Sequence, residues 1–106
     1  MQSQTVSLDK ENIYVLAERA KNGDREAFMA ITKMYQKNVF QLAYSFFQNR
    51  EDALDIVQDT FLRIYKKMHY YKKGKSFKNW TLQIAKNLCI DRYRKNHKKH
   101  EQKPLT

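Results

Sequence analysis

One stretch of the chain places a large apolar side chain among acidic and amide side chains. Between residues 53 and 68, apolar residues recur at helical spacing, so a helix is expected there. At 100° per residue its apolar stripe is centred near Phe61 and Ile64, and Leu62 falls on the opposite side. The residues on that side with Leu62 are Asp55, Gln58, Asp59 and Lys66. We interpret these five residues as a docking face for another protein, and a single exposed leucine on ordinary surface is the alternative.

A second stretch carries hydrogen-bonding and cationic side chains at helical spacing. They lie away from the apolar stripe of a helix expected over about residues 77–96, and they are Asn79, Gln83, Lys86, Asn87, Ile90 and Arg94. Amide side chains can form paired hydrogen bonds with base edges, and Lys or Arg can hold phosphates. The pattern therefore predicts contact with a nucleic acid, and an ordinary solvated helix face is the alternative.

Aromatic and cationic residues alternate just before that helix. The segment is Tyr70-Tyr71-Lys72-Lys73-Gly74-Lys75-Ser76-Phe77. Aromatic rings stack on exposed bases while lysines neutralise the backbone of a single strand. The segment predicts a loop that binds a single strand, and the alternative is that one of the two tyrosines only covers the edge of the core.

The distribution of charge points to an anionic partner. The chain has 106 residues, with 21 Lys and Arg against 11 Asp and Glu and a net charge of +10. Residues 63–106 hold 14 of the Lys and Arg but only Asp91 and Glu101, a net charge of +12, whereas residues 1–62 have a net charge of −2. A polyanion is therefore the expected partner of the C-terminal part.

Four helices are expected to position these residues in one all-α domain, a compact bundle. The length of the chain suits a single domain, and Gly23, Gly74 and Pro104 fall only between periodic segments. The expected helices cover about residues 9–21, 24–48, 49–68 and 76–96, and Asp24, Asn49 and Ser76 are their expected N-caps. The domain is expected over residues 1–97, with fraying from residue 97 and a basic linker or disordered tail over residues 98–106.

Several classes of function lack the residues they need. The longest apolar runs have five residues, which excludes a transmembrane helix and a signal-peptide core and predicts a cytoplasmic protein. The single Cys89 agrees with a reducing compartment. There is no phosphate-binding glycine loop and no Glu-x-x-His partner for the aspartates, so we expect no enzymatic activity, no metal and no cofactor.

Two segments resemble the extracytoplasmic-function sigma factors of bacterial RNA polymerase. Residues 52–65 resemble their polymerase-binding helix, and residues 77–87 followed by residues 91–94 resemble their promoter-reading helix. The resemblance covers about residues 24–97, most of region 2 of that family. It implies that the docking face binds the clamp helices of the polymerase β′ subunit. It also implies that the loop and the fourth helix open the −10 promoter element and recognise its non-template strand.

Carried over by position, the resemblance puts residues 71–76 in a loop that holds a flipped base. Extracting a base from its stack costs a few kcal/mol, which an aromatic wall and hydrogen-bond donors can offset. Gln83 and Asn87 would then meet neighbouring bases, Trp80 would lie in the core, and Asp91 would pair with a neighbouring arginine.

Other expectations follow from the family as a whole. An inhibitory anti-sigma factor is a possible partner, and family members continue into a second helical domain that reads the −35 element, which these 106 residues do not supply. The competing hypothesis is a free-standing basic helical protein that binds RNA or DNA without sequence preference.

Overall fold

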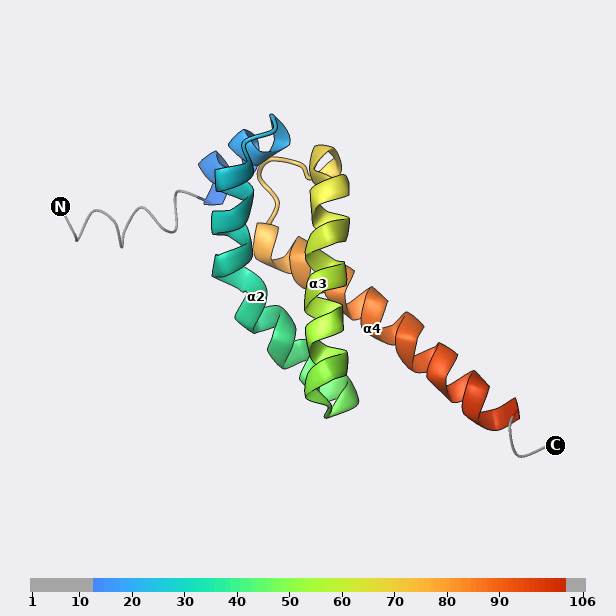
Figure 1. Ribbon diagram of the computed structural model, residues 1–106. Helices are drawn as coiled ribbons and strands as arrows, with labels where there is room; N and C mark the ends of the chain where they lie inside the picture. The colour runs from blue at the N-terminus through green and yellow to red at the C-terminus, as the bar shows by residue number, and fades with distance from the viewer. Residues whose placement is uncertain (1–12, 103–106) are drawn as a thin grey trace.

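The computed structural model describes residues 13–102, and side chains over residues 13–97, as an all-helical domain (Figure 1). An N-terminal helix covers residues 13–21. It is followed by α2 (Arg25–Phe47), α3 (Arg50–Lys66), the 3-10 helix η1 (Met68–Tyr70) and α4 (Phe77–Gln102). The predicted all-α bundle of four helices is confirmed. The expected start of the first helix near Asp9 lies outside the described residues.

Local side-chain caps set the helix starts where they were predicted. Asp24 accepts a hydrogen bond from the backbone N–H of Ala27 at 3.2 Å, and Asn49 accepts one from Asp52 at 2.9 Å. Arg19 lies 2.7 Å from the Asp24 carboxylate. The Arg19 hydrogen bond, followed by the one from Ala27, lowers the pKa of Asp24. The turn between the N-terminal helix and α2 is thus held at both sides of Gly23.

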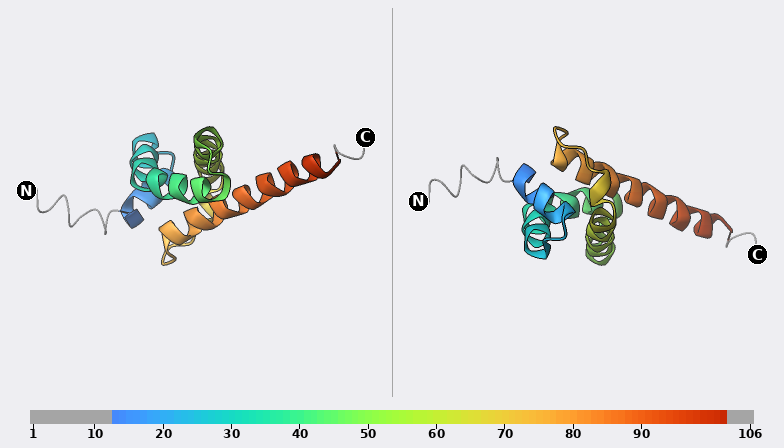
Figure 2. Two further views of the ribbon diagram at one scale, coloured as in Figure 1. Left: turned by 90° about the horizontal axis from the view of Figure 1, so that it is seen from below. Right: turned by 90° about the horizontal axis from the view of Figure 1, so that it is seen from above.

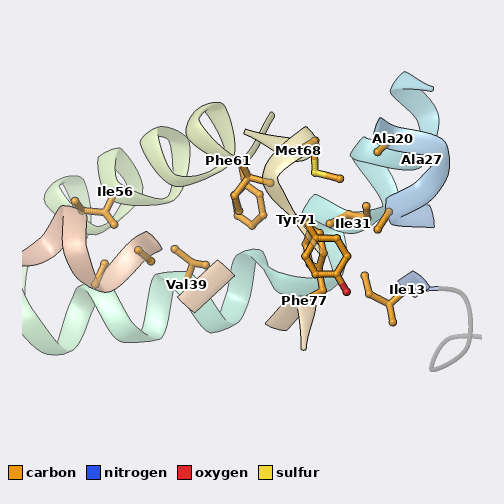
Figure 3. Packing of buried hydrophobic residues seen from close by; sticks show 14 of the residues in the cluster. Ile13, Ala20, Ala27, Ile31, Val39, Ile56, Phe61, Met68, Tyr71 and Phe77 are labelled. Atoms are coloured by element: carbon orange, nitrogen blue, oxygen red, sulfur yellow. The ribbon is translucent and has the colours of Figure 1, made fainter. Parts of the chain in front are cut away.

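The core lies where α2, α3 and α4 meet. In Figure 1, α2 and α3 run side by side in opposite directions, and α4 begins between them and passes behind α3. Figure 3 shows apolar side chains from these helices meeting at the centre. The buried apolar residues include Ala27, Ile31, Val39, Ala43, Ala53, Ile56, Phe61, Ile64, Met68, Phe77, Ala85 and Cys89.

The buried side of α4 differs from the expected stripe. Its fully buried positions are spaced four residues apart, at Phe77, Thr81, Ala85 and Cys89. Of the residues expected to face inward, which were Phe77, Trp80, Ile84, Ala85 and Leu88, Phe77 and Ala85 are buried. The other three are only half-buried and border the buried line. The difference arises because α4 crosses its neighbours obliquely, so small residues occupy the line of closest approach.

The end of α4 is also corrected. Fraying was expected from residue 97, but the helix continues to Gln102. No glycine or proline occurs between Gly74 and Pro104, and Lys, Glu and Gln are good helix formers. The 26 residues of α4 span about 39 Å at 1.5 Å per residue, and its last turns project from the body of the domain (Figure 2). None of the described helices has both the length and the apolar content needed for a membrane span.

Candidate functional site

The segment between η1 and α4, residues 71–76, forms a closed loop that we call the recognition loop. The Tyr71 hydroxyl donates a hydrogen bond to the backbone carbonyl of Lys75 at 2.6 Å. Inside this closure, the N–H of Lys75 donates to the carbonyl of Lys72 at 3.1 Å. Gly74 has φ = +96°, a left-handed conformation that glycine adopts without strain. The loop therefore has a defined shape before any ligand binds.

Ser76 joins the recognition loop to α4. Its hydroxyl accepts a hydrogen bond from the N–H of Asn79 at 3.1 Å, which confirms the predicted cap. The cap directs the chain from the loop into the helix that carries the amide side chains. As a result, Asn79 stands immediately beside the loop.

A hollow of about 420 Å³ lies between the recognition loop and the start of α4. Its lining contains aromatic rings, two lysines, a hydroxyl and two amides, from Tyr70, Tyr71, Lys72, Lys75, Ser76, Asn79, Trp80 and Gln83. Rings suit a planar base, amides and hydroxyls suit its polar edge, and lysines suit the attached phosphate. The structure thus brings together eight residues from η1, the loop and α4.

Tyr70, just before the recognition loop, and Tyr71, its first residue, have different environments, and this corrects one expectation. Tyr71 is only 4% exposed, with its ring edge-on to Phe77 at a centroid distance of 4.9 Å. Burial, followed by the neighbouring hydroxyls of Tyr14 and Tyr35, raises the pKa of Tyr71. Its ring cannot offer a free face to a base, so the expected stacking role of Tyr71 is wrong and the ring forms the floor of the hollow. Tyr70 is 65% exposed and has the free aromatic surface.

Trp80 was expected in the core and is found at its border. Its ring packs against Phe77 at 5.5 Å and against Tyr71 at 5.5 Å. The residue is only half-buried, and it also lines the hollow. Trp80 therefore joins the core to the wall of the candidate base site.

The remaining predicted residues of α4 lie on its exposed side. Asn79, Gln83, Lys86, Asn87 and Arg94 are all exposed. The Gln83 amide Nε2 donates a hydrogen bond to Oδ1 of Asn87 at 3.2 Å, so the two amides act as neighbours one turn apart. Both also leave donors and acceptors unused by this bond, which a base edge could engage.

A shallow polar groove lies between α2 and α4, and the sequence analysis missed it. It is lined by Asn38, Gln41 and Leu42 of α2 and by Lys78, Asn79, Leu82, Gln83 and Lys86 of α4. Asn79 and Gln83 also line the hollow, so they form the ridge between the two depressions. Asn38 and Gln41 are uncharged, so the charge pattern of the sequence does not mark them. Only the packing of α2 against α4 places them beside the predicted nucleic-acid face of α4.

The docking face of α3 is exposed as predicted. Its five residues are Asp55, Gln58, Asp59, Leu62 and Lys66, and Leu62 is 53% exposed. Tyr65, 54% exposed, lies on the same side, and its ring meets Phe28 of α2 edge-on at 5.1 Å. Spacing alone could have identified Tyr65, because it follows Leu62 by three residues on the helix.

An ion pair between helices replaces the one expected near the end of α4. Asp91 has no ion pair within residues 13–97. Its neighbour Arg92 instead approaches Asp52 at 3.6 Å and Asp55 at 3.5 Å, both on α3. The expected pairing of Asp91 with a neighbouring arginine is wrong, because the neighbouring Arg92 is turned toward the carboxylates of α3. No group of three or more potential metal-ligating side chains occurs in the described part of the chain.

The fold is that of a helical domain of the sigma-factor class. Residues 31–99 match the Sigma-70 region 2 family, and the chain belongs to this family. Region 2 is a non-enzymatic module of transcription initiation, in agreement with the expectation that the chain is not an enzyme. The resemblance to extracytoplasmic-function sigma factors is also confirmed by similar proteins.

The chain is similar to several bacterial sigma factors. It is 37% identical to the ECF RNA polymerase sigma factor SigW of Bacillus subtilis over 78 residues, which cover 74% of this chain and 42% of SigW. It is 39% identical to SigM of the same organism over 69 residues, 65% of this chain and 41% of SigM. The chain thus spans less than half the length of these relatives.

A solved structure shows the same fold. It is the NMR structure of a complex between an engineered region 2 of sigmaE and GTAAAA. The TM-score is 0.76 at 27% sequence identity, and the alignment covers 81% of this chain and 90% of that one.

Proposed function

We propose that this chain is the promoter-recognition and DNA-melting domain of a bacterial sigma factor. In this proposal it docks on RNA polymerase core and recognises the −10 element as single-stranded DNA. The observation that carries the proposal is the hollow, where exposed Tyr70, the half-buried Trp80 and the amides of Asn79 and Gln83 surround a space that can accept a base. The structural relative in complex with GTAAAA supports it, because that region 2 has the same fold.

The candidate DNA contacts divide into three kinds. Tyr70 is proposed to stack on a base at the mouth of the hollow, which Tyr71 and Trp80 also line. Lys72, Lys73, Lys75, Lys86 and Arg94 are exposed and are proposed to neutralise phosphates. Ser76, Asn79, Gln83 and Asn87 are proposed to hydrogen-bond with base edges on the non-template strand.

The partner proposed for the docking face is the pair of clamp helices in the polymerase β′ subunit. Leu62 supplies an exposed apolar anchor, and Asp55 and Asp59 supply negative charge around it. An apolar centre with a polar rim is the usual anatomy of a protein interface. An anti-sigma factor that covers the same surfaces is a further proposed partner, and the cytoplasm is the proposed compartment.

A binding experiment with the 106-residue chain tests this function. The chain would be mixed with a randomised pool of single-stranded hexanucleotides, and the bound fraction would be sequenced. A preferred sequence is expected, together with weaker binding to the same sequence as a duplex. Equal recovery of all sequences would instead favour a basic helical protein that binds nucleic acids without sequence preference. Co-purification with RNA polymerase core separates the two hypotheses independently, because only the sigma-factor proposal expects it.

A further inference from the structure

The N-terminal helix lies against the recognition loop, although the two are far apart in sequence. Lys21, its last residue, donates a hydrogen bond from Nζ to the backbone carbonyl of Tyr71 at 3.3 Å, across 50 residues of sequence. Figure 3 shows Ile13, at the other end of the described helix, beside the ring of Tyr71. Ile13 and Ala17 are buried in the same apolar cluster as Tyr71.

Tyr71 is the residue through which the N-terminal helix can act on the loop. Its carbonyl accepts the bond from Lys21, and its hydroxyl donates the bond that closes the loop at Lys75. The backbone of Tyr71 is extended, with φ = −68° and ψ = 129°, where the chain leaves η1. Tyr71 therefore determines both how the chain enters the loop and how the loop is closed. Lys21, which is outside the loop, binds the backbone of Tyr71.

The position and charge of Lys21, an exposed residue whose ammonium contacts the backbone of the loop, favour a structural role. The Lys21 contact with Tyr71 is partly buried, and Lys21 is at the C-terminal end of its helix, where a cation interacts favourably with the helix dipole. Lys21 does not line the hollow. It also lies outside residues 31–99, the part that matches the Sigma-70 region 2 family. The contact therefore joins a residue outside the matched segment to Tyr71 inside it.

We propose that Lys21 is a positioning residue that holds the recognition loop in the shape required to bind a nucleobase. This inference rests on the proposed function of the hollow. A hydrogen bond of this kind changes an equilibrium constant by roughly two- to tenfold. Loss of the bond is expected to loosen the loop and to weaken binding of a single strand by about that factor.

The first test measures the loop without DNA. In Lys21→Met, amide hydrogen exchange of Lys75, whose N–H donates to the carbonyl of Lys72, should become faster, while exchange in α2 and α3 stays unchanged. Lys21→Arg keeps a donor and should preserve the parent exchange rates. The matched control is Lys33→Met, which removes an exposed lysine of α2 and should leave the loop unchanged. Unchanged exchange of the loop in Lys21→Met would overturn the proposal.

The second test separates positioning from a direct phosphate contact. Affinity for the randomised hexanucleotide pool would be measured at several salt concentrations. Lys72→Met, in the loop itself, should reduce the slope of log affinity against log salt by about 0.7, the value for one phosphate on a single strand. Lys21→Met should weaken binding without changing that slope. A reduced slope in Lys21→Met would show that Lys21 contacts phosphate and would overturn the positioning role.

The two proposals fail in different ways. If the parent chain binds all single strands equally, the proposed function fails. The exchange test needs no ligand, so it still decides whether Lys21 orders the loop.

Discussion

Arg92 of α4 reaches across to α3, where its Nη1 lies 3.5 Å from Oδ2 of Asp55. The same atom lies 3.6 Å from Asp52, so one guanidinium is shared by two carboxylates. Asp55 belongs to the docking face, and Arg92 lies on the helix that carries the proposed base contacts. The two proposed surfaces are therefore connected by one partly exposed cation.

Arg92→Ala should lower the free energy of unfolding by about 0.5–1 kcal/mol at low salt, because exposed ion pairs contribute little and are screened. Urea unfolding at low and high salt measures this effect. Lys95→Ala, which removes another exposed cation of α4, is the control and should have a smaller effect. An equal loss at high salt would show that packing of the arginine stem, and not its charge, stabilises the contact.

Leu62→Ala should weaken binding to RNA polymerase core by about 2 kcal/mol, or about thirtyfold, because an exposed apolar anchor is a candidate hot spot. Asp59→Lys should also weaken binding. Affinity for purified core enzyme and the urea midpoint would be measured together. Val15→Ala, at 52% exposure on the N-terminal helix, is the matched control. Parent-like affinity in both docking-face variants would contradict the assignment of this face.

Tyr70→Ala should weaken binding to a single strand by about 1–3 kcal/mol with little change in stability, because it removes an exposed stacking ring. Tyr71→Phe should behave differently. It keeps the buried ring but removes the hydroxyl that closes the loop, so it should lower the free energy of unfolding by about 1 kcal/mol. Hexanucleotide titrations and urea unfolding of both variants distinguish the two roles. Loss of stability in Tyr70→Ala without loss of binding would assign Tyr70 to the fold.

Asn87→Ala should reduce the preference among bases at one position of the strand by about 1–3 kcal/mol, since a paired amide contact distinguishes bases. It also removes the acceptor for Gln83, so Gln83→Ala should change the same or an adjacent position. Affinities for single-base variants of the selected hexanucleotide measure this. Binding to polymerase core should remain at the parent level, because neither residue is on α3. A uniform loss for all bases would indicate a contact with the backbone instead.

The Cys89 thiol should make stability depend on pH above about 9. Burial raises its pKa from 9.0 to about 11, although the nearby Arg92 acts in the opposite direction. Between these values the unfolded chain loses the thiol proton while the folded chain keeps it, so the free energy of unfolding should fall as pH rises. Burial also raises the pKa of Tyr35 and Tyr71, which should extend the fall above pH 10.

Urea unfolding from pH 8 to pH 11 measures the dependence on Cys89. Cys89→Ala lacks the thiol, so its stability should fall less steeply between pH 9 and pH 10 than that of the parent. Identical slopes in the two proteins would show that the thiol does not contribute.

Sequence alone determined the features that depend on near neighbours along the chain. Asp24, Asn49 and Ser76 were identified as caps because a cap binds a backbone N–H three residues later. The exposure of Leu62 followed from its angle on the helix, which the periodicity of α3 sets. The family resemblance also depended on such local patterns.

Tertiary structure decided the features that depend on residues far apart in the chain. Tyr70 and Tyr71 are adjacent residues of the same type, so the sequence does not distinguish them. Only the packing of the loop over Phe77 buries Tyr71 and leaves Tyr70 exposed. The contacts of Arg92 with Asp55 and of Lys21 with Tyr71 join segments separated by 37 and 50 residues. Helical periodicity assigns each residue to a side of its own helix, but the crossing of the helices decides which distant residue that side meets.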